Sequence, residues 1–163
     1  MSNSLIYEKA SALIKVASAK GLTIATAESC TGGWIGKALT EISGSSSVFM
    51  GGLITYSNQA KIDLLGIPPE ILEFYGAVSE PVAGAMAQQS RDMLSTDIAV
   101  SVTGIAGPTG GSKDKPVGMV CFGIITRGNK PITITKRFGN IGREGVRQKT
   151  VLTAISLINA NLK

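Results

Sequence analysis

The chain has 163 residues, 44% of them hydrophobic and 17% charged, and it carries a formal net charge of +5. These values predict one globular domain over residues 1–163 and exclude a disordered chain. No apolar stretch reaches the roughly 18 residues that are needed to cross a bilayer. Because the N-terminus lacks the pattern of a signal peptide, we expect a cytoplasmic protein whose positive charge suits an anionic ligand.

Apolar periodicity and turn residues predict eleven helices and strands in the order αβαβαααβββα. In the first half we expect helices over residues 4–20, 31–42, 58–65 and 68–74, and strands over 22–27 and 48–56. Gly51 and Gly52 indicate a bulge or a close backbone approach in the second strand. In the second half we expect a helix from Ser79, as its cap, to Leu94, then strands over 98–102, 119–126 and 132–138, and a helix over 142–162.

The early strands alternate with helices, so they should be parallel, whereas the last two strands form a hairpin. We therefore predict an α/β fold: a three-layer α/β/α sandwich with a mixed, mostly parallel sheet of about five strands. Ligands of such sheets bind outside the carboxyl ends of the strands. The two glycine-rich loops, after Ala27 and after Val102, lie at this edge.

The absence of histidine restricts the chemistry of any nucleophile in this chain. A serine would have to be activated by lysine, a carboxylate or a metal hydroxide. Zinc prefers clusters of His and Cys, and the chain has only Cys30 and Cys121, which we expect to be reduced thiols. Glu28 and Glu80 could bind Mg²⁺, but their spacing does not require it. We therefore expect no metal or cofactor, and lysine is the base to look for.

The first glycine-rich turn, Ala27 to Gly33, places Ser29 between a buried strand and a helix. The backbone N–H groups of Thr31, Gly32 and Gly33 are expected to point outward there, where they can hold a phosphate or an oxyanion. The alternative is that Ser29 or Thr31 only caps the helix. The double glycine favours a functional turn, because a simple cap does not need two residues that weaken the first helical turn.

Further candidate residues follow in three other segments. Lys61 lies on a short helix after the second strand; a desolvated lysine can act as a base, although the sequence alone favours a solvated lysine. Tyr56 has the same ambiguity, because a tyrosine at the end of a strand is more often a half-buried packing residue than a catalytic acid. In the long loop over residues 103–118, Thr103, Gly104 and Gly107 are candidates because such loops are more often functional than idle. Arg143 and Arg147, four residues apart on one helix face, could clamp a phosphate or could simply face solvent.

Four motifs together resemble one family, the C-terminal domain of the competence-damage-inducible protein CinA. They are residues 27–33 (AESCTGG), 54–58 (ITYSN) with Lys61, 76–80 (GAVSE) and 103–108 (TGIAGP). The resemblance covers nearly the whole chain and is closest to the stand-alone nicotinamide mononucleotide deamidases. It implies an amidohydrolase that converts nicotinamide mononucleotide to nicotinate mononucleotide and ammonia in pyridine nucleotide salvage, and it implies a homo-oligomer. The N-terminal domain of larger members, linked to ADP-ribose pyrophosphatase activity, is not matched.

The resemblance also assigns roles by position. Ser29 matches the nucleophile of the family and Lys61 its general base, with Tyr56, Thr31 and Thr103 as hydroxyl residues around them and Arg143 near the substrate. The glycines Gly32, Gly33, Gly104 and Gly107 are the expected backbone contacts to substrate.

Two other functions remain open from the sequence: a non-catalytic domain that senses a nucleotide or phosphate, and an amidase of another small substrate. A nucleic-acid binder is disfavoured because the basic residues are scattered and only 5% of residues are aromatic.

Overall fold

The computed structural model describes residues 2–163, apart from the side chain of Ser2, and its elements follow the expected order. The helices are α1 (Ser2–Lys20), α2 (Trp34–Thr40), α3 (Asn58–Leu65), α4 (Pro69–Tyr75), α5 (Glu80–Leu94) and α6 (Arg143–Ala160). The strands are β1 (Ile24–Glu28), β2 (Phe49–Ile54), β3 (Ile98–Gly104), β4 (Met119–Thr126) and β5 (Ile132–Arg137), and a 3₁₀ turn covers Ser45–Ser47.

The five strands form one mixed sheet in the order β2-β1-β3-β4-β5. β1 pairs in parallel with β2 and β3, while β4 runs antiparallel to β3 and to β5. The register of β2 shifts after its first residue, so that Phe49 pairs with Ile24 and Gly51 with Ala25. This bulge, and a backbone at Gly52 so close to Thr26 that a Cβ would collide with its hydroxyl, confirm both expectations for the glycine pair.

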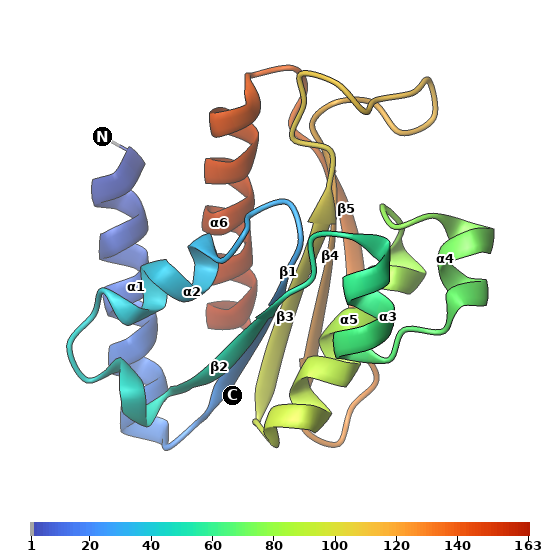
Figure 1. Cartoon of the computed structure of the whole chain (residues 1–163). Helices are drawn as coiled ribbons and strands as arrows, with labels where there is room; N and C mark the ends of the chain where they lie inside the picture. Colours follow the sequence, from blue (N-terminus) through green and yellow to red (C-terminus); the bar gives the residue numbers. More distant parts are fainter. Residues whose placement is uncertain (1) are drawn as a thin grey trace.

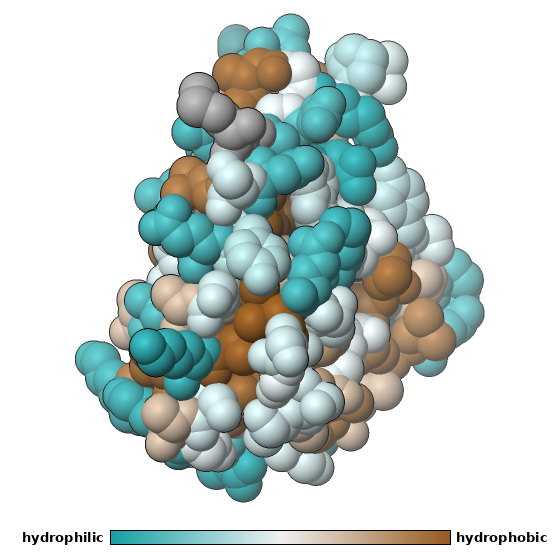
Figure 2. Space-filling model, turned by 90° about the vertical axis from the view of Figure 1, so that its left-hand side faces the viewer, coloured by the Kyte–Doolittle hydropathy of each residue, from teal (hydrophilic) through white to brown (hydrophobic). Residues whose placement is uncertain are grey.

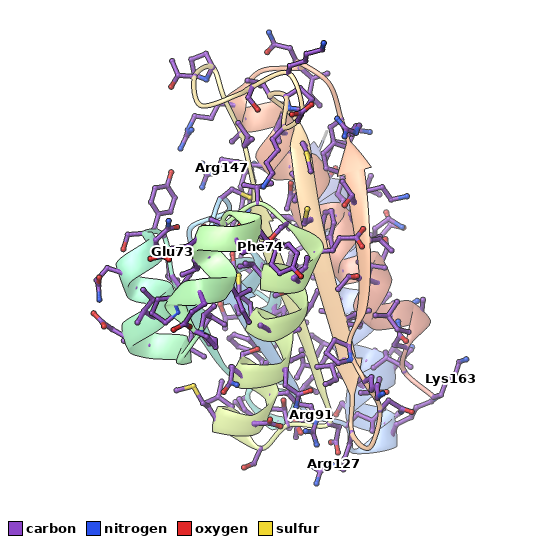
Figure 3. The ribbon with its side chains drawn as sticks, turned by 90° about the vertical axis from the view of Figure 1, so that its right-hand side faces the viewer. Glu73, Phe74, Arg91, Arg127, Arg147 and Lys163 are labelled. Carbon is purple, nitrogen blue, oxygen red and sulfur yellow. The ribbon has the colours of Figure 1, made fainter. Side chains whose placement is uncertain are left out.

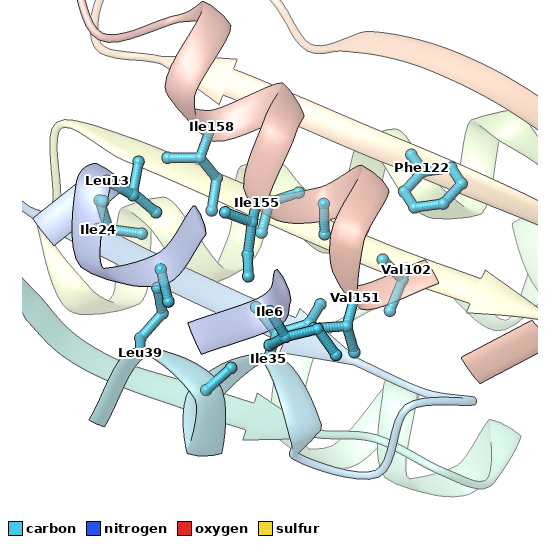
Figure 4. Packing of buried hydrophobic residues seen from close by; sticks show 14 of the residues in the cluster. Ile6, Leu13, Ile24, Ile35, Leu39, Val102, Phe122, Val151, Ile155 and Ile158 are labelled. Atoms are coloured by element: carbon cyan, nitrogen blue, oxygen red, sulfur yellow. The ribbon is translucent and has the colours of Figure 1, made fainter. Parts of the chain in front are cut away.

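Helices cover both faces of the sheet, as Figure 1 shows, so the three-layer sandwich is confirmed. α1, α2 and α6 pack on one face around the larger apolar cluster, part of which Figure 4 shows. α3, α4 and α5 pack on the other face over smaller clusters. The carboxyl ends of β1, β2 and β3 all lie at the upper edge of the sheet in Figure 1, where the glycine-rich loops begin.

Three local expectations need correction. The second helix begins at Trp34 rather than at Thr31, so Gly32 and the capping Gly33 precede it. Ser79 precedes α5, but its hydroxyl donates to the Gly76 carbonyl at 2.7 Å and accepts nothing from the first turn of the helix. The third strand also runs on to Gly104, two residues beyond the expected end, because β4 continues to pair with it as far as Val120.

The surface carries few charges, as the composition predicts. Figure 2, which views the molecule from the side of α1, shows many pale residues of intermediate hydropathy between the hydrophilic ones. Within residues 2–163, no helix combines the length and the apolar character needed to cross a membrane.

Candidate active site

The end of β1 directs two neighbouring side chains to opposite faces of the sheet. Side chains alternate along a strand, and Ala27 packs in the cluster beneath α3, α4 and α5. Glu28 therefore points toward α2, and Ser29 points back toward α3. The amide of Ser29 still donates to the Val102 carbonyl at 3.1 Å, so the serine continues the parallel ladder with β3.

Glu28 caps the helix that follows the turn, the role that the alternative interpretation gave to Ser29 or Thr31. Its side chain is only 2% exposed, and its two carboxylate oxygens accept four hydrogen bonds. The donors are the Thr31 hydroxyl at 2.6 Å and the backbone N–H groups of Gly33, Ile35 and Gly36 at 3.0, 3.1 and 2.8 Å. A carboxylate at this end also complements the helix dipole.

The expectation that the N–H groups of Gly32 and Gly33 point outward is wrong. The N–H group of Gly33 faces Glu28, and that of Gly32 donates to the Ser29 carbonyl at 3.0 Å. Neither group points outward. In contrast, the N–H groups of Cys30 and Thr31 donate to no backbone carbonyl of residues 2–163, so they are the ones left for a ligand.

Replacing Glu28 by glutamine should destabilise the domain. The amide group of glutamine would face at least one of the N–H donors at α2, leaving it buried and unpaired, which costs about 1–3 kcal/mol. We expect the free energy of unfolding in urea to fall by this amount. The matched control is Glu70→Gln in the first turn of α4, where the carboxylate is exposed; an equal effect at both positions would contradict the cap.

Lys61 is buried against Ser29. α3 begins at the Ser57 cap, whose hydroxyl accepts the Ala60 N–H, and it turns Lys61 toward the sheet, where only 1% of the residue is exposed. The amine donates to Ser29 Oγ at 3.0 Å and to the Thr55 carbonyl at 2.7 Å. Burial disfavours the ammonium and lowers the pKa of Lys61 from 10.5 to about 8. The solvated lysine favoured by the sequence is therefore wrong.

Tyr56 and Arg143 meet at the rim of a cavity of about 230 Å³. Arg143, at the start of α6, donates to the Tyr56 hydroxyl at 2.7 Å and to the Gly107 carbonyl at 2.8 Å. Ser29 lines the same cavity. Its other walls include Cys30, Gly104, Ile105, Ala106, Gly107 and Thr109. Tyr56 is 59% exposed, so it is not a packing residue, and the structure brings it together with Ser29, Gly104, Gly107 and Arg143.

Arg147, on α6, binds the backbone of the turn that follows Ser29. Its guanidinium donates to the carbonyls of Cys30 at 3.2 Å and Thr31 at 2.9 Å, and it lies 5.3 Å from the centre of the Trp34 ring. A second hollow, of about 670 Å³, lies here, and its walls include Gly32, Gly33, Trp34, Lys37, Arg143 and Arg147. Figure 3 shows Arg147 toward the upper end of the molecule, far from Arg91 and Arg127 at the lower end. Arg143 borders both hollows and joins them into one basic surface.

The hydroxyls of two candidate residues already have partners. Thr31 is fully buried and donates to Glu28, and Thr103 is 1% exposed and donates to the Ala77 carbonyl at 2.9 Å. Both thus stabilise the loops around Ser29 in this structure. Cys30 lines the cavity, but burial raises the pKa of its thiol to about 12, so it remains protonated near neutral pH.

The two carboxylates considered for Mg²⁺ are engaged elsewhere. Glu28 caps α2, and Glu80 accepts from the hydroxyls of Thr133 and Thr135. Among residues 2–163 no three His, Cys, Asp or Glu side chains gather closely enough to hold a metal ion. Cys30 and Cys121 are both free thiols.

Comparison with known proteins assigns the chain to a family. The model of the CinA C-terminal domain matches residues 7–162. The chain belongs to this family. A CinA-like protein of Leptospira biflexa is 50% identical over 141 residues, which cover 86% of this chain and 34% of the relative. A CinA-like protein of Mycobacterium marinum is 47% identical over 140 residues, covering 85% of this chain and 32% of the relative. The CinA domain thus spans about a third of the length of such curated relatives.

Solved structures agree on the fold of the CinA domain. The competence/damage inducible protein CihA of Agrobacterium tumefaciens superposes with a TM-score of 0.93 at 46% identity, covering 95% of this chain and 94% of that one. A CinA superfamily protein of Escherichia coli gives a TM-score of 0.89 at 33% identity, with 94% and 88% covered.

Proposed function

We infer that this CinA domain is an amidohydrolase, which hydrolyses the carboxamide of nicotinamide mononucleotide to nicotinate mononucleotide and ammonia. The observation that carries this proposal is the contact of 3.0 Å between the Lys61 amine and the Ser29 hydroxyl. A nucleophile and a base within hydrogen-bond reach, with the pKa of the base brought near neutrality, are what acyl transfer requires. Lys61 meets both conditions without histidine.

In the proposed reaction the neutral Lys61 amine takes the proton of Ser29 Oγ as the oxygen attacks the carboxamide carbon. The resulting ammonium then gives this proton to the amide nitrogen, the C–N bond breaks, and ammonia leaves with an ester on Ser29. Water, deprotonated by Lys61, attacks that ester, and the proton returns to Ser29 Oγ as the carboxylate product departs. Acid, base and nucleophile are thereby restored.

Backbone donors next to Ser29 support this chemistry. The peptide unit after Ser29 is fixed because its carbonyl accepts the Gly32 N–H, and the next unit is fixed because Arg147 binds the Cys30 carbonyl. The N–H groups of Cys30 and Thr31 are therefore held in place, and neither donates to a backbone carbonyl of residues 2–163. We assign them to the oxyanion of the tetrahedral intermediate, where one such donor contributes about 3 kcal/mol.

The phosphate of the substrate suits the basic surface around Arg143. This residue borders the cavity of Ser29 and also the larger hollow with Arg147 and Lys37. A pyridine ring held beside Ser29 would place its ribose phosphate toward these cations, and arginine binds phosphate with paired donors. The same surface fits the alternative of a nucleotide sensor, which would need neither Ser29 nor Lys61.

Ammonia release separates these possibilities. The purified domain should release ammonia from nicotinamide mononucleotide and, much more slowly, from nicotinamide riboside, which lacks the phosphate. Binding of the mononucleotide without ammonia release would favour the sensor, and release from another small amide alone would redirect the substrate assignment. A homo-oligomer and a cytoplasmic location, which the resemblance and the composition imply, stay predictions.

A further inference from the structure

Arg147 directs a positive charge at the backbone of the turn that follows Ser29. Its Nε donates to the Cys30 carbonyl at 3.2 Å and its Nη2 donates to the Thr31 carbonyl at 2.9 Å. The residue is half-buried, yet none of the ion pairs among residues 2–163 includes it. Charges taken out of water are usually paired with an opposite charge, so a guanidinium that binds two carbonyls instead leaves its charge available to the groups around it.

The two carbonyls belong to the peptide units that lead to both oxyanion donors. The Cys30 carbonyl shares its peptide unit with the Thr31 N–H, so a cation on the oxygen strengthens this N–H group as a donor. The Thr31 carbonyl shares its unit with the Gly32 N–H, which donates to the Ser29 carbonyl at 3.0 Å. The Ser29 carbonyl in turn shares its unit with the Cys30 N–H. The guanidinium therefore polarises the Thr31 donor through one peptide unit and the Cys30 donor through two.

The charge of Arg147 also acts on the side chain at this position. Burial raises the pKa of the Cys30 thiol to about 12 and the charge of Glu28 adds to the rise, whereas the charges of Arg147 and Lys61 oppose it. A cation that favours a thiolate here also favours the oxyanion of an intermediate that forms beside it.

Arg143, one helical turn earlier on α6, is placed differently. Its guanidinium donates to the Tyr56 hydroxyl at 2.7 Å and to the Gly107 carbonyl at 2.8 Å, at the rim of the Ser29 cavity. Neither of these groups belongs to the turn after Ser29. Arg143 is also exposed, whereas Arg147 is half-buried. A phosphate can therefore bind Arg143 without disturbing the backbone donors, to which Arg147 is linked.

We propose that Arg147 is a positioning residue for the oxyanion: its charge holds the turn and strengthens the N–H donors of Cys30 and Thr31, while Arg143 takes the phosphate. This role rests on the proposed function for its effect on turnover, but its effect on the two amides does not depend on any substrate. Oxyanion donors act on the transition state rather than on bound substrate. Loss of Arg147 should therefore lower kcat, whereas loss of Arg143 should raise KM.

The test compares Arg147→Gln with Arg147→Lys and with Lys149→Gln. Glutamine removes the charge, whereas lysine keeps it, can still donate to a carbonyl of the turn and serves as the rescue. Lys149 is exposed and lies two residues further along α6, so its replacement removes the same charge from the same helix and is the matched control. Urea unfolding of each variant establishes that it is folded under the conditions of the measurements.

The first readout is the amide ¹⁵N resonance of Thr31 in the protein without substrate. A hydrogen bond to the carbonyl of a peptide unit deshields the nitrogen of that unit. The resonance should therefore move upfield in Arg147→Gln, return most of the way in Arg147→Lys and stay in place in Lys149→Gln. An unchanged Thr31 resonance in Arg147→Gln overturns the proposal whether or not the protein releases ammonia.

The second readout is kcat and KM for nicotinamide mononucleotide. Removing one oxyanion donor costs about 10²–10³-fold in kcat, and because Arg147→Gln weakens the donors without removing them, we expect a loss of about tenfold with little change in KM. Arg147→Lys should recover most of this loss, and Lys149→Gln should match the parent protein. An unchanged kcat in Arg147→Gln, or a rise in KM alone, overturns the proposal. Absent ammonia release from the parent protein, with the Thr31 shift present, overturns only the proposed function.

Discussion

Replacing Ser29 by alanine should abolish ammonia release while leaving the domain folded. Ser29 is 8% exposed and its Oγ contacts only the Lys61 amine among the hydrogen bonds of its side chain, so its removal costs little packing. Loss of the nucleophile of a comparable hydrolase reduces kcat by about 10⁴-fold or more, the residual rate coming from oriented binding alone. Steady-state kinetics on nicotinamide mononucleotide measure this loss, and the KM should change much less.

The neighbouring thiol provides the control for this experiment. Cys30 lines the same cavity and is an alternative nucleophile by position, but burial raises its pKa to about 12. A protonated thiol is a poor nucleophile, so Cys30→Ala should keep most of the kcat of the parent protein. The reverse pattern, an active Ser29→Ala and an inactive Cys30→Ala, would show that the assignment of the nucleophile is wrong.

Replacing Lys61 by methionine should also abolish turnover, and it should change how stability depends on pH. The pKa of Lys61 is about 8 in the folded protein and 10.5 in an unperturbed lysine. Below pH 8 the folded state bears the full cost of burying the ammonium. Between pH 8 and 10.5 the unfolded state binds more protons, so stability rises with pH as this cost disappears. Methionine has nearly the same length and no titration in this range.

The difference in the free energy of unfolding between the parent protein and Lys61→Met should grow as the pH rises. The free energy of unfolding of the parent protein, relative to Lys61→Met, should increase by about 3 kcal/mol from pH 7 to 10.5. Urea unfolding at several pH values measures this difference. The contributions of other titrating groups cancel in it because both proteins contain them. Lys149→Met on the exposed side of α6 is the control and should show no such trend. A constant difference for Lys61→Met would mean that the lysine is not held at a lowered pKa.

The sequence predicts the architecture well because local signals agree with the tertiary structure. Residues 58–65 and 119–126 match α3 and β4 to the residue, since a hydroxyl cap and flanking glycines mark their ends. The position of Ser29 between strand and helix was sufficient to place it at the carboxyl edge of the sheet. The family motifs then supplied Lys61 as its partner, a pairing that spacing alone did not favour.

The local details of the site depend on packing and could not be obtained from the sequence. Whether Lys61 is buried is decided by how α3, through Leu65, docks on a cluster that includes Val82 and Met86, which lie far along the chain. The link between Arg143 and Tyr56 spans 87 residues. The cap of α2 is an exception, because the sequence does carry a signal for it. Strand alternation across Ala27, Glu28 and Ser29 indicates that the glutamate and the serine face opposite sides of the sheet, which leaves the carboxylate to cap α2.

The pH dependence of kcat/KM tests the central claim most directly, because the base must be uncharged to act and Lys61 loses its proton as the pH rises. Activity should therefore increase from pH 6 upward and level off above an apparent pKa of about 8, the value for the buried amine. Lys149→Met, which removes an exposed lysine of α6, should give the same profile as the parent protein. A rate that stays constant from about pH 6 to 9.5, or one whose rise begins only near the pKa of a solvated lysine, would contradict activation of Ser29 by a buried, neutral Lys61.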